Sequence, residues 1–333
     1  MGGDRGPEEV VRGVLNAAAG SSCGFLLVGD PAVIEPGPHQ KRPDNVSVVP
    51  ASDVIGMDES PTAALRRKPD ASVAVGARLV REGRADALVT IGNTGAAMAV
   101  SLLTMGRIKG VDRPAIAAAL PTAAGGSVLL LDAGATVDCD PNNLFEFAVM
   151  GSVYAEHVLG IRKPRVGLLS NGEEDAKGNE LVKRTHLLFA QCAGPQAAFH
   201  FIGNVEGSDL FRGDVDVVVC DGFVGNVLLK TGEGVAEMIL SLLRAELSRT
   251  VWTRALAGPL RPALRRLRSR LDYTERGGAP LLGVNGLCII GHGRSNAAAV
   301  TSACDIAVRA AQTNVVALIR DRICHVPTPP PLS

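Results

Sequence analysis

Six short apolar runs, each followed by small polar residues, constrain the fold of this chain most strongly. They read FLLVGDP (25–31), ALVTIGNTGA (87–96), SVLLLDAGATVDC (127–139), RVGLLSNGEE (165–174), VDVVVCDGFVGNVLLKT (215–231) and LCIIGHGRSN (287–296). Apolar runs of this length are typical of strands buried in parallel sheets. Helix-period segments separate them, such as Val73, Gly76, Ala77 and Val80 at i, i+3, i+4 and i+7. The alternation predicts an α/β fold, with a mostly parallel sheet covered by helices on both faces.

The polar residues after these strands predict a binding site for an anion. The carboxyl ends of parallel strands meet at one edge of a sheet, where α/β proteins bind their ligands. If the six ends converge, glycine-turn amides, helix N-termini and side-chain amides form a receptor for phosphate or an oxyanion. GNTGA (92–96) is the sharpest piece, because its glycines allow close backbone approach while Asn93 and Thr94 donate hydrogen bonds. A purely structural turn is the alternative for this short motif.

Charged side chains and one imidazole near the turns are further candidates for the anion-binding site. Lys177 and Lys230 each follow a polar turn, and each is equally compatible with an ordinary exposed lysine. His292, in GHGRSN, is the only histidine in a glycine turn at a strand end. Glu173 and Glu174 follow the fourth strand, where they could instead complement a helix N-terminus.

Composition and missing motifs exclude several classes of protein. Lys and Arg number 34 and Asp and Glu number 34, and aromatic residues are only 3%, which does not favour a nucleic-acid surface. The sequence has no H-x-x-H or H-E-x-x-H and its acidic residues are scattered, so we expect no metal site. It also lacks the phosphate-binding loop G-x-x-x-x-G-K-[ST] and the serine-hydrolase motif G-x-S-x-G.

The chain suits a reducing compartment. Seven cysteines show no C-x-x-C spacing, and the N-terminus has no apolar segment typical of a secretion signal. Apolar stretches are interrupted before reaching about 18 residues, so no membrane-spanning helix is expected. We expect a single α/β catalytic domain over 1–325 and a disordered proline-rich tail, VPTPPPLS, over 326–333.

Residues 235–273 interrupt the alternation and predict a helical hairpin with its turn near Gly258-Pro259. Its second arm has a leucine stripe, with arginines mostly around the rest of the helix: Leu260, Leu264, Leu267 and Leu271. A basic amphipathic element of this kind could lie on an anionic membrane or bind an acidic protein. A dimer-forming arm with a solvated basic face is the other interpretation, and the two are compatible.

Longer ordered blocks resemble one known family. MGGDRGP, IGNTGA, GATVDC, KGNELVKRTH, DVDVVVCDGFVGNVLLKT, LDYTERGGAPLLGVNG and IIGHGRSNA closely resemble the bacterial phosphate acyltransferases of phospholipid synthesis, and the similarity covers nearly the whole chain. The resemblance implies reversible transfer of a fatty acyl group from acyl carrier protein to orthophosphate. The acyl phosphate formed would supply a downstream glycerol-3-phosphate acyltransferase.

The same resemblance implies a fold, an oligomeric state and a cellular location. The fold would be a Rossmann-like three-layer α/β/α unit, similar to isocitrate dehydrogenases and phosphotransacetylases. The protein would be a cytoplasmic homodimer that contacts the membrane peripherally through the hairpin. It would need no cofactor and would bind no nucleic acid.

The strand ends and the resemblance together give the expected site residues. The expected catalytic residues are Lys177, Asn226, Lys230 and His292. The expected substrate-binding residues are Gly3, Asp4, Gly92, Asn93, Thr94, Gly95, Asp132, Gly134, Gly172, Glu173, Asn179, Asp221, Gly222 and Phe223. Asn93, Thr94, Asn226 and Lys230 would hold phosphate, while Lys177 and His292 would steady the thioester oxygen or the phosphate. Positioning is the main requirement, because phosphate is already an anionic nucleophile and a thiol of pKa about 8.5 leaves readily.

Two departures from the family pattern are visible. Relatives usually begin with a short apolar strand and Asp-Ala before the Met-Gly-Gly-Asp block, whereas this chain starts at that methionine. We therefore expect either that translation starts upstream of this methionine or that the sheet lacks this strand and a pocket aspartate. Thr136 stands where relatives usually have asparagine, and Ser170-Asn171 stands where many have asparagine and an apolar residue.

Two other functions stay open at this point. One is a phosphate acetyl- or butyryltransferase that uses coenzyme A thioesters. The other is a catalytically silent membrane scaffold for lipid enzymes.

Overall fold

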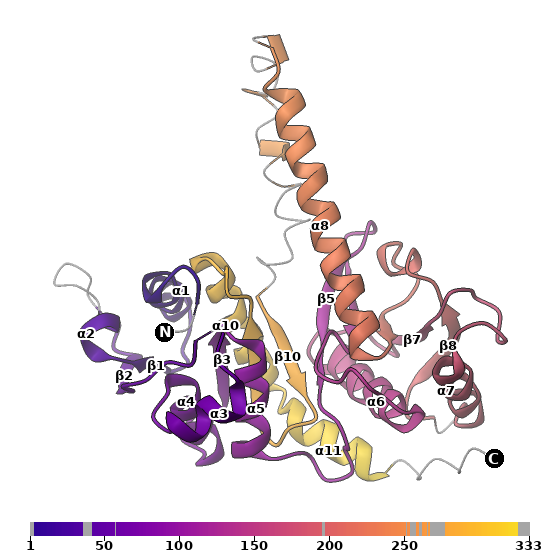
Figure 1. Ribbon diagram of the computed structural model, residues 1–333, viewed down its shortest axis with the longest axis horizontal. Helices are drawn as coiled ribbons and strands as arrows, with labels where there is room; N and C mark the ends of the chain where they lie inside the picture. Colours follow the sequence, from indigo (N-terminus) through magenta and orange to yellow (C-terminus); the bar gives the residue numbers. More distant parts are fainter. Residues whose placement is uncertain are drawn as a thin grey trace.

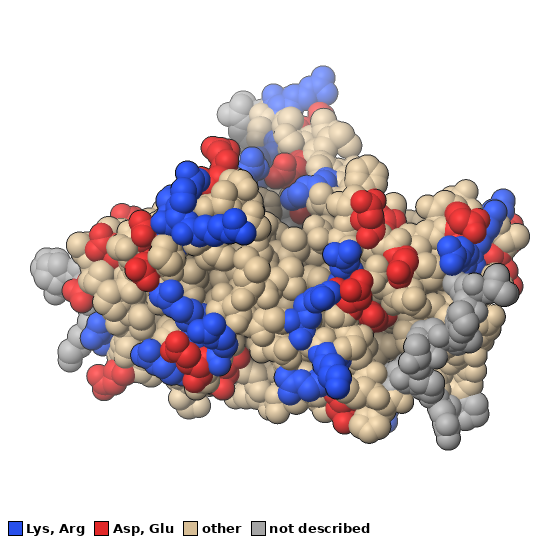
Figure 2. Space-filling view, turned by 60° about the horizontal axis from the view of Figure 1, so that its bottom comes forward, with Lys and Arg blue, Asp and Glu red and all other residues tan. Residues whose placement is uncertain are grey.

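The computed structural model describes residues 3–35, 42–56, 58–194, 197–250 and 277–325, with short pieces at 252–253, 258–259, 262–264 and 266. The described strands form three hydrogen-bonded sheets in two lobes, and helix α8 (Gly222–Leu247) projects from between the lobes (Figure 1). On the face shown in Figure 2, basic and acidic side chains are interspersed, so this face has no continuous surface of one sign.

The first lobe contains a two-stranded and a four-stranded sheet. β1 (Phe25–Gly29) pairs in parallel with β2 (Val46–Pro50). In the other sheet β3 (Ala87–Ile91) pairs in parallel with β11 (Leu287–Gly291), and the antiparallel strands β10 (Ala279–Leu282) and β4 (Ala115–Ile116) complete the order β3-β11-β10-β4. The helices of this lobe are α1 (Pro7–Ala19), α2 (Pro31–Ile34), α3 (Pro61–Arg67), α4 (Ser72–Arg81), α5 (Thr94–Met105), α10 (Ala297–Gln312) and α11 (Val315–His325).

The second lobe is built on a five-stranded sheet in the order β5-β6-β9-β7-β8. Its strands are β5 (Ala118–Pro121), β6 (Ser127–Leu131), β7 (Arg165–Leu169), β8 (His200–Val205) and β9 (Val217–Val219). All pairings are parallel except that of β5 with β6. Helices α6 (Pro141–His157) and α7 (Glu180–Gln191) and the short 3-10 helix η1 (Asp209–Phe211) belong to this lobe.

All six strands expected from the apolar runs form, as β1, β3, β6, β7, β9 and β11. Alternate residues of each strand face opposite helical layers: Leu88 and Cys288 pack with α4 and α5, while Ile289 packs with α10. The predicted α/β fold with helices on both faces of the sheet is confirmed. The strands missed from the sequence are β2, β4, β5, β8 and β10. Three of them, β4, β5 and β10, have only two to four residues.

One core joins the two lobes. α6 is buried along most of its length, including Phe147 and Met150, which have no exposed surface. Its side chains share a cluster with Ile289 of β11, Ala303 of α10 and Ile319 of α11. Packing between the lobes is therefore continuous beneath the base of α8.

Helix α8 forms the first arm of the predicted hairpin but begins earlier than predicted. The first helix begins at Gly222 rather than near Val235, because Asp221 caps it immediately after β9. Most of the second arm and the tail at 326–333 lie outside the described residues, so those predictions and the single-domain organisation stay predictions. Within the described part of the chain, no helix is both long and apolar enough to cross a membrane.

Candidate active site

A cavity of about 400 Å³ lies between the lobes at the base of α8. Four of the six predicted strand ends reach it, and their polar or glycine residues line it: Thr94, Gly95, Gly134, Asn226, Lys230 and His292. Apolar side chains form other parts of the wall: Met98, Ile116, Leu120, Leu229 and Ile290. Groups that can bind an anion thus share one space with an apolar surface.

The polar residues between strands and helices also cap the helices that follow them, which the sequence analysis did not predict. Asn93 caps α5, Asp221 caps α8 and Asn296 caps α10, each accepting a hydrogen bond of 2.9 Å from a first-turn N–H group. Asn179 caps α7 in the same way. Much of the polar pattern that predicted a ligand site is therefore used to start helices.

The turn at the start of α8 is tightly packed against the loop after β6. The N–H of Gly222 donates to the carbonyl oxygen of Thr136 at 2.8 Å. A Cβ at Gly225 would overlap the carbonyl oxygen of Asp132, so this position requires glycine. Gly134, with φ of 129°, lies against the side chain of Asn226. These contacts bring the ends of β6 and β9 together and place Asn226 at the cavity.

Asp132 orders that loop from beneath. Its side chain is fully buried, and its carboxylate accepts hydrogen bonds from the N–H groups of Ile116 (2.8 Å), Gly134 (3.1 Å), Ala135 (2.9 Å) and Thr136 (2.6 Å). Burial raises the pKa of Asp132, and the four N–H donors act in the opposite direction. Asp132 therefore shapes the cavity without lining it.

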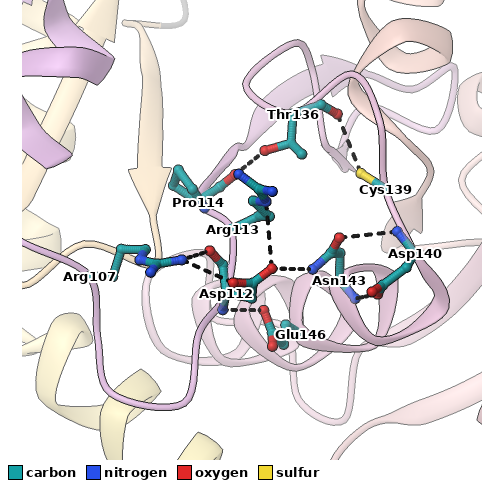
Figure 3. A network of polar contacts seen from close by, with 9 residues as sticks. All are labelled: Arg107, Asp112, Arg113, Pro114, Thr136, Cys139, Asp140, Asn143 and Glu146. Atoms are coloured by element: carbon teal, nitrogen blue, oxygen red, sulfur yellow. Dashed lines mark hydrogen bonds and ion pairs between the residues drawn. The ribbon is translucent and has the colours of Figure 1, made fainter.

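A second network holds the same loop from the side of α6 (Figure 3). Thr136 Oγ1 donates to the Pro114 carbonyl at 3.1 Å, and Asp140 forms a capping box with Asn143. The N–H of Asp112 donates to Glu146 at 2.9 Å. Burial raises the pKa of Glu146 to about 7. Thr136, the departure from the family pattern, thus ties the loop after β6 to the segment that leads into β4.

His292 is held as a neutral hydrogen-bond donor. Its Nδ1 lies 3.1 Å from the backbone N–H of Arg294, which can only donate, so Nδ1 accepts and the proton sits on Nε2. Burial, and next the charge of Lys230, lower the pKa of His292. The ring therefore stays neutral near pH 7 and presents an Nε2–H group.

Lys230 does not stand alone in the cavity. Its Nζ lies 2.8 Å from Glu233 Oε2, and both residues line the cavity. Glu233 was missed from the sequence, although its i, i+3 spacing from Lys230 on a helix was a usable signal. The Lys230 side chain is 53% exposed, so the pair is weak enough for a bound anion to compete for the lysine.

Several expected site residues lie elsewhere. The Asn93 side chain is engaged with Ala96 and with the Gly56 carbonyl, at 2.9 and 3.0 Å. Asp4 donates its N–H to Gly293 at 2.8 Å and so supports the turn that carries His292. Phe223 is 62% exposed on α8. The loop after β7 and other members of the expected set do not line the cavity: Gly3, Gly92, Gly172, Glu173, Lys177, Asn179, Asp221 and Gly222.

Among the described residues, no group of three or more His, Cys, Asp or Glu side chains is placed to hold a metal ion. The cavity instead offers N–H groups, an amide, an imidazole and one lysine. This donor set suits a phosphate or an oxyanion.

Solved structures with a similar fold support the α/β fold class. A branched-chain phosphotransacylase from Enterococcus faecalis V583 has a TM-score of 0.55 at 17% identity, covering 91% of this chain and 95% of its own. A phosphotransacetylase from Streptococcus pyogenes also has a TM-score of 0.55, at 14% identity, covering 92% and 98%. At these identities the likeness shows the α/β fold of that class alone.

Sequence relatives are much closer. The profile of the family described as "Fatty acid synthesis protein" matches residues 1–318. A phosphate acyltransferase from Heliobacterium modesticaldum is 52% identical over 326 residues, 97% of this chain and 96% of the relative. One from Synechococcus sp. strain JA-3-3Ab is 51% identical over 316 residues, 95% of this chain and 86% of the relative. The chain therefore belongs to this family of phosphate acyltransferases, and the prediction of an acyltransferase enzyme is confirmed.

Proposed function

We propose that the protein transfers a fatty acyl group from the thioester of acyl carrier protein to orthophosphate, reversibly, and releases acyl phosphate. The observation that supports this proposal is the cavity at the base of α8, where anion-binding groups and an apolar wall face one space. Such a cavity suits a substrate with a charged acceptor and an apolar donor group. Acyl phosphate is a reactive anhydride, so a downstream acyltransferase that uses glycerol 3-phosphate is its proposed consumer.

Phosphate would bind at the start of α5. Thr94 and Gly95 are the first two residues of this helix, where N–H groups lack intrahelical partners and the helix dipole is positive. Lys230 and Asn226 face the same cavity from α8. This set replaces the one expected from the sequence, because Asn93 is occupied as a cap and Lys177 lies on the loop after β7.

The reaction then needs alignment rather than a protein nucleophile. A phosphate oxygen attacks the thioester carbonyl carbon, the new C–O bond forms, and the C–S bond breaks to release the carrier thiolate. The carbonyl oxygen bears negative charge in the transition state, and the Nε2–H group of His292 is the proposed donor to it. One such donor is worth about 3 kcal/mol. The glycines at 134 and 291 leave the backbone accessible beside the reacting groups.

The apolar wall would receive the first part of the acyl chain. Each buried methylene contributes about 0.8 kcal/mol, so this wall favours longer acyl groups over acetyl. Met98 and Leu120 approach it from different lobes, so the chain would lie across the junction between them.

The test is thiol release by the purified protein. With a long-chain acyl carrier protein, we expect free thiol and acyl phosphate, trapped as hydroxamate, only when phosphate is present. Asn226→Ala should reduce the rate more than tenfold. A preference for acetyl- or butyryl-coenzyme A would assign the protein to short-chain transfer. No phosphate-dependent release with either donor would favour the scaffold function.

We also propose that α8 carries the contacts outside the active site, in a homodimer and at the membrane surface. Exposed apolar side chains repeat along one face of this helix: Val227, Val235, Met238, Ile239 and Leu242. Replacing the last three with serine should convert a dimer to a monomer in light scattering, or abolish sedimentation with anionic vesicles. If neither measurement changes, this face serves neither contact.

A further inference from the structure

Glu233 places an acidic side chain in a cavity whose other polar groups suit an anion. It lines the cavity at the base of α8 together with Asn226 and Lys230. Positions 226, 230 and 233 are related as i, i+4 and i+7, so the three side chains lie on one face of α8. Thr94 and Gly95, at the start of α5, line the same cavity. A carboxylate in this position repels an anion that carries no proton, so it affects which anions can bind.

The Glu233 carboxylate can accept one more hydrogen bond than it does. Its side chain is 14% exposed, whereas that of Lys230 is 53% exposed. Lys230 Nζ donates to Glu233 Oε2 at 2.8 Å, and within the described part of the chain the second oxygen, Oε1, accepts no hydrogen bond. As the anionic partner of this ion pair, Glu233 can accept hydrogen bonds but cannot donate them. A bound group beside Oε1 therefore has to supply the proton.

The groups around Glu233 supply the attraction for an anion. His292 lines the same cavity, and its pKa is lowered by burial and next by the charge of Lys230, while the charge of Glu233 raises it. The imidazole is therefore within electrostatic reach of both charged side chains. The first N–H groups of α5 and the ammonium group of Lys230 also attract negative charge. The cavity thus combines several hydrogen-bond donors with a charged acceptor at Glu233.

Phosphate and sulfate differ in the one property that such an acceptor detects. Both are tetrahedral, and hydrogen phosphate and sulfate are both dianions. Orthophosphate keeps at least one P–OH group at neutral pH, because its last proton leaves only in strongly alkaline solution, whereas sulfate keeps none. Glu233 Oε1 can accept a hydrogen bond from the P–OH group of phosphate. Against sulfate it would meet only another acceptor, and two shielded acceptors in contact are unfavourable.

We propose that Glu233 is a specificity-determining residue, whose carboxylate accepts a hydrogen bond from the P–OH group of bound phosphate and excludes sulfate. The inference rests on the phosphate site proposed above at the start of α5. A site built to bind a substrate hydroxyl rejects an analogue without it by about 10⁴-fold. Lys230 is half exposed and its charge attracts either anion, so the expected preference is smaller, about 100-fold.

Isothermal titration calorimetry of the full chain at neutral pH measures this preference, with inorganic phosphate, sulfate and monofluorophosphate as the probes. Monofluorophosphate is a dianion with the shape of hydrogen phosphate and with fluorine in place of the hydroxyl group. It therefore separates the hydrogen bond from charge and size. Glu233→Gln keeps the size of the side chain but can donate as well as accept. Glu237→Gln is the matched control, because Glu237 lies one turn further along α8, is exposed and does not line the cavity.

We expect the unsubstituted protein to bind phosphate about 100-fold more tightly than sulfate or monofluorophosphate. Glu233→Gln should reduce this preference to less than about tenfold, mainly through tighter binding of sulfate, whereas Glu237→Gln should keep it. Phosphate and sulfate affinities within about threefold of each other in the unsubstituted protein would overturn the proposal. An unchanged preference in folded Glu233→Gln would overturn it as well.

The comparison of the three anions on the unsubstituted protein needs no variant, so it decides the question even if Glu233→Gln does not fold. The titrations also need no acyl donor, which separates them from the test of acyl transfer. Selective phosphate binding without acyl transfer would refute the proposed function and leave the role of Glu233 intact. Binding of none of the three anions would refute the phosphate site and, with it, this role of Glu233.

Discussion

Replacing Asp132 with alanine should destabilise the protein severely, although the residue touches no part of the cavity. Four backbone N–H groups converge on its carboxylate from β4 and from the loop after β6. A buried donor left without a partner costs about 1–3 kcal/mol. Partial relaxation of the loop lowers the summed cost of the four unpaired N–H groups. We therefore expect Asp132→Ala to reduce the free energy of unfolding by about 4 kcal/mol. Total stabilities are typically about 5–15 kcal/mol, which makes this a large fraction.

Replacing Asp132 with asparagine should cause a smaller loss of stability than alanine does. Its carbonyl oxygen can still accept from Ile116 and Gly134, but its NH₂ group would face the N–H of Thr136, which now lies 2.6 Å from the carboxylate. We expect a loss of about 2 kcal/mol, with reduced acyl transfer because Gly134 and Asn226 lose their fixed positions.

Urea unfolding followed by circular dichroism measures both losses. Asp138→Ala is the matched control, because Asp138 lies in the same polar stretch after β6 but is exposed. It should change stability by less than about 0.5 kcal/mol. If the free energy of unfolding of Asp132→Ala lies within about 1 kcal/mol of that of the unsubstituted protein, the carboxylate does not hold the loop. The structural role assigned to Asp132 is then refuted.

Four further predictions concern the cavity and the residues that support it. His292→Ala should slow acyl transfer about 100-fold, while His292→Gln, which can keep a donor near Nε2, should lose less; equal losses would argue against donation from Nε2. Because the pKa of His292 is lowered, the rate should stay level as pH falls to about 6.5 and decline only in more acidic solution. The pKa of Glu146 is raised from 4.5 to about 7, so the folded state binds its proton more tightly and stability should fall as pH rises from 4.5 to 7. That fall is about 1–2 kcal/mol after allowance for partial exposure, and urea titrations of Glu146→Gln should lack it. Gly225→Ala should cost at least about 3 kcal/mol of stability in the same assay because its Cβ would overlap Asp132, whereas Gly234→Ala, in open space on the same helix, should be neutral or stabilising.

Local patterns predicted six of the eleven strands in the described part of the chain, and only part of the cavity lining. The apolar runs gave β1, β3, β6, β7, β9 and β11. Four of the polar residues expected from the strand ends, Thr94, Asn226, Lys230 and His292, line one cavity, and their roles stay predictions. Asn93 and Asn179 have the same local signature, yet their side chains cap helices. A polar residue between a strand and a helix can serve either purpose, and only its surroundings decide which.

The sequence by itself determined the family, the α/β class and the positions of six strands along the chain, because apolar runs and long ordered motifs are properties of neighbouring residues. Only the tertiary structure decided which strand ends meet and that Asp132 supports the cavity from beneath. Those outcomes depend on contacts between segments far apart in sequence. Such contacts are fixed by packing and by the need to pair buried backbone groups, which no local pattern records.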